Sequence, residues 1–159
     1  MIEVAIHGVI RDSESDSYVM LLREKQGEKV LPIFIGEGEA AAIIVALEGL
    51  PFPRPLTHDL LKLIIDALQG KVVRVVVSDL SKDTYYAKIY LEANNNLVGI
   101  DARPSDSVAL AIRVKSPVYV ADSIMDTNGL ILKGKDMNID ELKNRLRNLN
   151  PEDFGKFEM

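Results

Sequence analysis

The sequence contains no cysteine and no tryptophan, and only two of its 159 residues are histidine. The absence of cysteine excludes disulfide bonds and thiolate metal sites, and it gives no sign of an oxidising compartment. Neither His7 nor His58 has a second histidine at metal-ligand spacing, so no zinc motif of the HExxH type is present. A P-loop and a GxGxxG motif are also absent, which removes the common nucleotide-binding signatures.

Long apolar runs are missing as well. No stretch reaches the ~18 residues that a membrane-spanning helix needs. Residues 1–7 have no basic region and no apolar run of the length found in a secretory signal. We therefore expect a cytoplasmic protein that makes no use of a membrane.

Basic residues are also fewer than acidic ones. Lysine and arginine number 19 against 24 aspartate and glutamate residues, giving a net charge of −5. This balance disfavours a protein that binds nucleic acid mainly by neutralising phosphates, because such proteins normally carry a basic surface. It leaves room for a nuclease with an acidic, metal-binding centre and basic residues at its edge.

The residues that are present predict one globular α+β domain. Hydrophobic residues make up 47% of the chain and charged residues 27%, which is ordinary for a soluble domain with a sizeable core. Alternating patterns predict two antiparallel meanders, with strands at 2–10, 18–22, 30–35, 72–77, 84–93 and 97–100. Helices are expected at about 39–48, 58–68, 104–115 and 139–149. We expect mixed, largely antiparallel sheets with the helices packed around a central buried helix at about 104–115. The main body covers residues 1–136, and residues 137–159 form a C-terminal helix and docking tail of the same domain.

The first predicted helix is unusual because residues 40–47 are apolar on every face. Such a helix is expected to be buried all round. In a small domain, one of its faces is also a reasonable subunit contact. A central core helix and a homodimer interface therefore remain equal alternatives, and we expect a homodimer with apolar surface of this helix or of an edge strand in the contact.

Residues 99–122 organise the rest of the chain as strand, turn, helix and strand. Pro104 suits the first turn of a helix, where its missing N–H costs nothing. Ser105 and Asp106 fall in the same turn, where they can cap free N–H groups and meet the positive end of the helix dipole. Asp101, Arg103 and Asp106 therefore cluster where a strand ends and a helix begins, a common place for chemistry in α/β proteins.

A second helix start brings further candidates to this cluster. Arg54 precedes a proline, and His58 and Asp59 occupy the first turn of the helix that Thr57 is expected to cap. Carboxylates can hold Mg²⁺ or Mn²⁺, arginine can grip phosphate through two parallel hydrogen bonds, and histidine can move a proton. The candidate catalytic residues are His58, Asp59, Asp101, Arg103 and Asp106; the candidate substrate-binding residues are Arg54, Arg103 and Arg113; and the candidate metal ligands are Asp101 and Asp106.

A purely structural interpretation of the same residues is the stronger alternative. Asp59 and Asp106 can simply favour the helix dipole. Pairs such as Asp106 with Arg54, or Asp101 with Arg103, can be buried ion pairs that hold the two helix starts together. Glu37 and Glu39 are interpreted in the same way, as first-turn partners of the dipole.

Several of these segments carry a family resemblance. Residues 100–111, IDARPSDSVALA, resemble the signature of the bifunctional nuclease family, and so do LPIFIGEGEA at 31–40, RPLTHDLL at 54–61 and PEDFGKF at 151–157. Plant members of that family are described as cleaving both DNA and RNA. The resemblance implies a low-specificity nuclease that hydrolyses phosphodiester bonds in DNA and RNA, with a divalent metal ion as cofactor. The alternatives are a non-catalytic regulatory module that binds an anion or small ligand, and a homo-oligomeric interaction protein.

Overall fold

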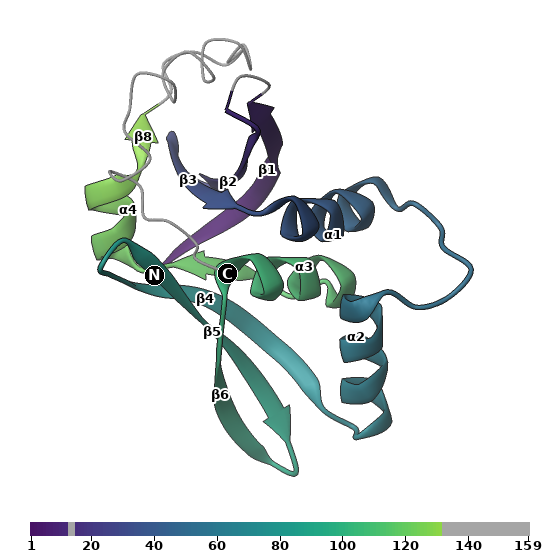
Figure 1. Ribbon diagram of the computed structural model, residues 1–159. Helices are drawn as coiled ribbons and strands as arrows, with labels where there is room; N and C mark the ends of the chain where they lie inside the picture. The colour runs from purple at the N-terminus through teal and green to yellow at the C-terminus, as the bar shows by residue number, and fades with distance from the viewer. Residues whose placement is uncertain (13–14, 132–159) are drawn as a thin grey trace.

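A computed structural model describes residues 1–12 and 15–131 (Figure 1). Within these residues the chain forms eight strands and four helices, so the predicted α+β class is confirmed. In chain order the elements are β1 (Ile2–Asp12), β2 (Ser17–Glu24), β3 (Lys29–Ile35), α1 (Glu37–Glu48), α2 (Thr57–Ala67), β4 (Lys71–Ser81), β5 (Thr84–Ala93), β6 (Asn96–Ala102), α3 (Pro104–Val114), β7 (Val118–Val120), α4 (Asp122–Asn128) and β8 (Leu130–Ile131).

The two predicted meanders form a single sheet with the order β6-β5-β4-β7-β1-β2-β3-β8. All neighbours in it are antiparallel except β4 and β7. The short strand β7 joins the two halves, because Val120 pairs with Ile2 on one side and with Val77 on the other. The sheet is therefore mixed and largely antiparallel, as the sequence predicts.

The core explains why α3 lies at the centre of the fold. Residues on one face of β4 and β5, among them Val75, Val77 and Tyr85, are fully buried. Helix α3 covers this face and is itself buried at Pro104, Ser105 and from Ser107 to Ala111. The expectation of a central buried helix at this place in the sequence is met, and the first two residues of that helix are buried.

Helix α1 corrects one expectation. Only Glu39, Ala40 and Ile43 are buried in it, and Leu47 is 41% exposed. Within a single copy of the chain, the remaining faces of α1 are open to solvent, so a helix buried on all sides in the core is wrong, while a subunit contact through these faces stays a prediction.

Two further differences concern helix starts. Thr57 is the first residue of α2 rather than its cap, and the Leu56 backbone N–H donates to Asp59 Oδ2 at 2.9 Å. Ser105 and Asp106 do not cap α3; its first turn is tied instead by Ser107 Oγ, which donates to the carbonyl of Arg103. The carboxylate of Asp106 is thus left for other partners.

Near the end of the described chain, α4 replaces the irregular segment expected after Asp122. The predicted helix at 139–149 and the tail after Pro151 lie outside the described residues. No helix of the described part is long and apolar enough to cross a membrane.

Candidate functional site

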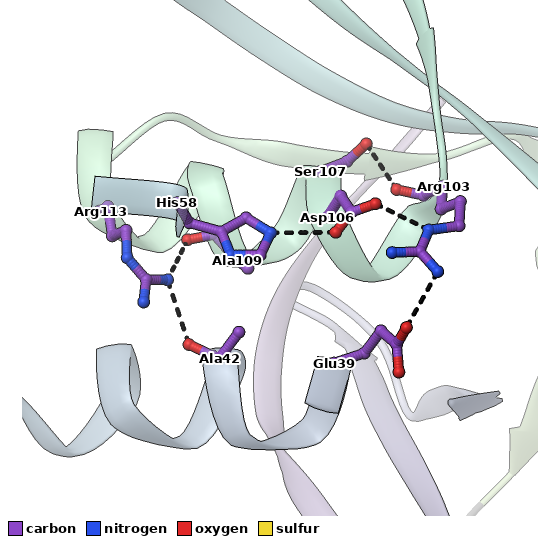
Figure 2. Close-up of polar contacts among 8 residues, drawn as sticks. All are labelled: Glu39, Ala42, His58, Arg103, Asp106, Ser107, Ala109 and Arg113. Carbon is purple, nitrogen blue, oxygen red and sulfur yellow. Dashed lines mark hydrogen bonds and ion pairs between the residues drawn. The ribbon is translucent and has the colours of Figure 1, made fainter. Parts of the chain in front are cut away.

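The starts of α2 and α3 meet in a hydrogen-bonded network (Figure 2). His58 Nε2 lies 3.0 Å from Asp106 Oδ1, and Arg103 Nε donates to Asp106 Oδ2 at 2.7 Å. Both carboxylate oxygens of Asp106 are therefore engaged, one by a residue of each helix start. The sequence placed these three residues at two helix N-termini, and the structure brings them together.

Glu39 of α1 extends the network on the far side of Arg103. Arg103 Nη1 donates to Glu39 Oε1 at 2.9 Å, and the Glu39 side chain is only 8% exposed (Figure 2). The other oxygen, Oε2, is buried without a hydrogen-bond partner. Arg103 thus bridges two carboxylates, while its Nη2 has no acceptor in the described part of the protein.

The protonation of the network follows from these contacts. The hydrogen bond from His58, together with Arg103, lowers the pKa of Asp106 to about 2 against the opposing effect of burial. The same carboxylate raises the pKa of the Arg103 guanidinium. Asp106 is therefore ionised at neutral pH and only accepts, so His58 Nε2 carries the hydrogen of this contact, and Nδ1 has no partner among the described residues.

Solvent reaches one side of this network. The side chains of Arg103 and Asp106 are 39% and 31% exposed, and that of His58 is 12% exposed. An ionised carboxylate, an oriented imidazole and a partly open guanidinium thus share one surface. This combination can bind an anion and transfer a proton.

A second hydrogen-bonded network is built on Arg113, in the last turn of α3. Its Nε donates to Asp59 Oδ1 at 2.8 Å, and its Nη1 donates to the carbonyls of Ala42 and Ala109. The Arg113 side chain is 7% exposed. With its donors directed at α1, α2 and α3, Arg113 ties the three helices together and has little surface left for a substrate.

Asp59 has the same structural character. Its two oxygens accept from the Leu56 backbone N–H and from Arg113, and these hydrogen bonds lower its pKa. His58, the preceding residue, faces Asp106 instead. The two neighbours therefore serve different networks, His58 that of Asp106 and Asp59 that of the buried Arg113.

The remaining predicted residues lie elsewhere. Asp101 is exposed on β6 opposite Lys88 of β5, on the face of the sheet away from the buried Ala87. Within the described residues it makes no hydrogen bond or ion pair with the network. Arg54 lies in the α1–α2 loop and lines a cavity beside Asp59 and Arg113.

The network does not fit a metal centre made of protein ligands. Asp106 uses both oxygens, and the cation between Asp106 and Glu39 is the guanidinium of Arg103. Across residues 1–12 and 15–131, no three histidine, aspartate or glutamate side chains converge in a way that could hold a metal ion. The pairing of Asp101 with Asp106 as metal ligands therefore stays a prediction from sequence, and no chemical step below depends on it.

Glu39 is the network residue that sequence reasoning did not place there. The sequence pattern could have indicated its place, because Glu39 shares a helix face with Ala40 and Ile43, the other two buried positions of α1. A carboxylate on a buried apolar face requires a charged partner. That requirement points to one of the arginines of the other helices.

The fold and this network define an α+β domain with a histidine–carboxylate–arginine site open to solvent. The model of the bifunctional nuclease domain matches residues 20–133 of this chain, which therefore belongs to the bifunctional nuclease domain family. The matched region contains every residue of both networks.

Proteins from a mycobacterium and from plants are similar to this chain. An uncharacterized protein of Mycobacterium tuberculosis is 37% identical over 162 residues, covering 96% of this chain and 97% of its own length. Bifunctional nuclease 1 of Oryza sativa subsp. japonica is 30% identical over 125 residues, covering 76% of this chain. Bifunctional nuclease 2 of Arabidopsis thaliana is 26% identical over 117 residues. The matches take in only 38% of the rice protein and 36% of the Arabidopsis protein, so both plant proteins contain much that this alignment does not include.

Proposed function

We propose that this protein is a low-specificity nuclease that hydrolyses phosphodiester bonds in DNA and RNA, with the His58–Asp106–Arg103 network as its reactive centre. The observation that carries the proposal is the 3.0 Å contact between His58 Nε2 and Asp106 Oδ1 on a partly open surface. Family membership and the names of the plant relatives support it at the level of the family.

The chemistry assigns a role to each member of the network. Asp106 holds the imidazole of His58 in one orientation, so that Nδ1 can accept the proton of the attacking water; as the P–O bond to the leaving oxygen breaks, that oxygen takes a proton from the imidazolium or from solvent. Arg103 Nη2 can donate to a phosphate oxygen and stabilise the charge that grows there during attack. Glu39 fixes the guanidinium through Nη1, which makes it a positioning residue.

The test is a cleavage assay on supercoiled plasmid and single-stranded RNA, in Mg²⁺, in Mn²⁺ and in EDTA. We expect the wild-type protein to cut both substrates and the His58→Gln variant to cut neither. His7→Gln is the matched control, because His7 is an exposed histidine of β1 outside the network. Equal cleavage by wild-type and His58→Gln protein would contradict the proposal. Loss of cleavage in EDTA would support the metal dependence that the sequence predicts.

A non-catalytic anion-binding module is the second candidate. The observation that favours it is the bridging of Arg103 by two carboxylates, which is typical of a fixed ion-pair network as well as of an active site. Under this alternative, the protein would bind a short oligonucleotide in the same buffers, and the oligonucleotide would stay intact.

We also propose that the protein is a homodimer formed through β6. This strand is an edge of the sheet in the described chain, and it exposes Leu97, Val98 and Ile100 by 43–55%. Long apolar edges are usually covered or blunted. Antiparallel pairing of β6 with the β6 of a second copy is self-complementary about a two-fold axis, and it would cover both edges with one contact.

A further inference from the structure

A cavity of about 560 Å³ lies beside the reactive centre and is not part of it. The end of α1, the loop between α1 and α2, one face of α2 and Arg113 of α3 form its walls. Its lining includes Phe52, Arg54, Lys62, Leu63, Asp66 and Arg113. The volume is within the range of sites that bind small molecules or single nucleotides.

The loop that forms one wall is stiff. Residues 50–55 read Leu-Pro-Phe-Pro-Arg-Pro, so each proline fixes its own φ and restricts the residue before it. Phe52 stands between two of these prolines and is 51% exposed. An aromatic ring held in place at the surface loses little entropy when a flat ligand stacks on it.

The charge of the cavity differs from that of the chain. Its lining carries three cationic side chains, Arg54, Lys62 and Arg113, and two acidic ones, Asp59 and Asp66. Asp59 is paired with Arg113. Arg54 and Lys62 make no ion pair or hydrogen bond in the described part of the protein, so they are available to a ligand. The cavity is thus locally positive on a chain whose net charge is −5.

We propose that this cavity binds one nucleotide of a single-stranded nucleic acid, with the base stacked on Phe52 and the phosphate held by Arg54 and Lys62. A ring face beside two free cations is the usual arrangement for binding single strands without reading their sequence. A duplex does not satisfy it, because its bases are already stacked on one another. The inference rests on the proposed function: Asp59 lines the cavity and His58 is the preceding residue, so the cavity lies close enough to the reactive centre to hold a nucleotide of the strand that is cut.

The experiment measures binding of a fluorescently labelled oligothymidylate by anisotropy in EDTA, with gel analysis to show that the strand stays intact. The wild-type protein is compared with Phe52→Ala, Arg54→Gln and Lys62→Gln. Lys82→Gln is the matched control, since Lys82 is an exposed lysine of the β4–β5 turn that does not line the cavity. Melting temperatures establish that each variant is folded.

We expect Phe52→Ala to weaken binding about tenfold, as for the loss of one base stack. Arg54→Gln and Lys62→Gln should each reduce the slope of log K against log salt concentration by about 0.7, the value for one phosphate contact on a single strand. Lys82→Gln should leave both quantities unchanged. Unchanged binding in all three cavity variants, or equal affinity for a duplex, would overturn the assignment.

The two proposals can fail separately. Cleavage by the wild-type protein with the same KM in Phe52→Ala would overturn the cavity assignment and leave the proposed nuclease in place. Binding that depends on Phe52 and Arg54 in a protein that cuts no substrate would retain the cavity assignment and contradict the proposed nuclease.

Discussion

His58 and Asp106 are separated by 48 residues, yet His58 Nε2 lies 3.0 Å from Asp106 Oδ1. The contact joins the first turns of α2 and α3, and it leaves Nδ1 of the same ring without a partner among the described residues. The stability of the helix pair and the orientation of the imidazole therefore depend on one carboxylate. Variants of this carboxylate can separate a catalytic role from a structural one.

Asp106→Asn should abolish cleavage while the protein stays folded. Asn lacks the charge that orients and stabilises the imidazole, but it is nearly isosteric with Asp. Arg103 keeps Glu39 as a partner, so the loss of stability should be about 1–2 kcal/mol, below the roughly 3–5 kcal/mol of a fully stranded charge. Cleavage assays and thermal unfolding measure the two effects. A folded, strongly destabilised variant that still cuts at the wild-type rate would identify Asp106 as a structural residue only.

Arg103→Lys tests the bridging geometry. A lysine ammonium keeps the charge but cannot direct Nε and Nη1 at two carboxylates while offering a third donor to a phosphate. We expect kcat to fall at least tenfold, with a loss of stability of about 1 kcal/mol. Steady-state cleavage kinetics and denaturant titration give both numbers. A variant with unchanged kcat would show that the guanidinium has no part in the reaction.

Arg113→Met should act on stability. Arg113 is 7% exposed and its donors reach Asp59 and the carbonyls of Ala42 and Ala109. Removal of the guanidinium takes one partner from each of these acceptors, and the expected cost is limited to roughly 2–3 kcal/mol because Asp59 is 40% exposed and keeps the Leu56 N–H. Urea unfolding measures the change, with Arg23→Met on β2 as a control. A loss of unfolding free energy below about 0.5 kcal/mol is typical of an ordinary surface substitution. Such a small change would show that Arg113 does not hold the three helices together.

The pH dependence of stability follows from Asp106. Its pKa is lowered from 3.8 to about 2 in the folded state, so the unfolded state binds the proton more tightly. The stabilising contribution is therefore complete above about pH 4 and is lost as the pH falls through about 2. The difference in unfolding free energy between wild-type and Asp106→Asn protein should shrink by roughly 1–2 kcal/mol between pH 6 and pH 2. A constant difference across this range would contradict the ion-paired state of Asp106.

The β6 interface predicts a dimer mass in light scattering at micromolar concentration. A double substitution of Leu97→Lys and Val98→Lys places charges on both faces of the edge strand and should give monomers. Leu68→Lys is the control, because Leu68 is 73% exposed on another part of the surface, just past the end of α2. A wild-type protein of monomer mass would contradict the dimer.

Local patterns in the sequence predicted much of the fold. The strand at 84–93 was placed with its observed bounds, because turn residues flank it on both sides, Lys82 and Asp83 before it and Asn94 and Asn95 after it. The central helix was placed within one residue, because Pro104 marks its start and Ser116-Pro117 follow its end. The exposed faces of α1 were missed, since alanine-rich apolar runs look alike whether or not they are covered.

The site was harder to predict because its contacts are long-range. Arg103 and Asp106 are three residues apart and could be paired from the helix period alone. The contact of Arg103 with Glu39 spans 64 residues and depends on how α1 packs on α3, which no local pattern contains. Asp101 was grouped with Asp106 by closeness in sequence, but strand alternation places it beside Lys88 on the face of the sheet away from the core.

During folding, the sheet is complete only when β7 has paired with the strands on both sides of it. This three-residue strand follows α3 in the chain and yet sits between β1 and β4, so residues near position 2 must wait for residues near position 120. Each hairpin can form early from neighbouring residues, whereas closure of the middle of the sheet requires a very long loop to be ordered. Helix α1 packs on β1 and β2, and α3 packs on β4 and β5. In a chain in which β7 has not yet paired, the two halves of the sheet would be unjoined, and the contact of Glu39 with Arg103 would have to form between them.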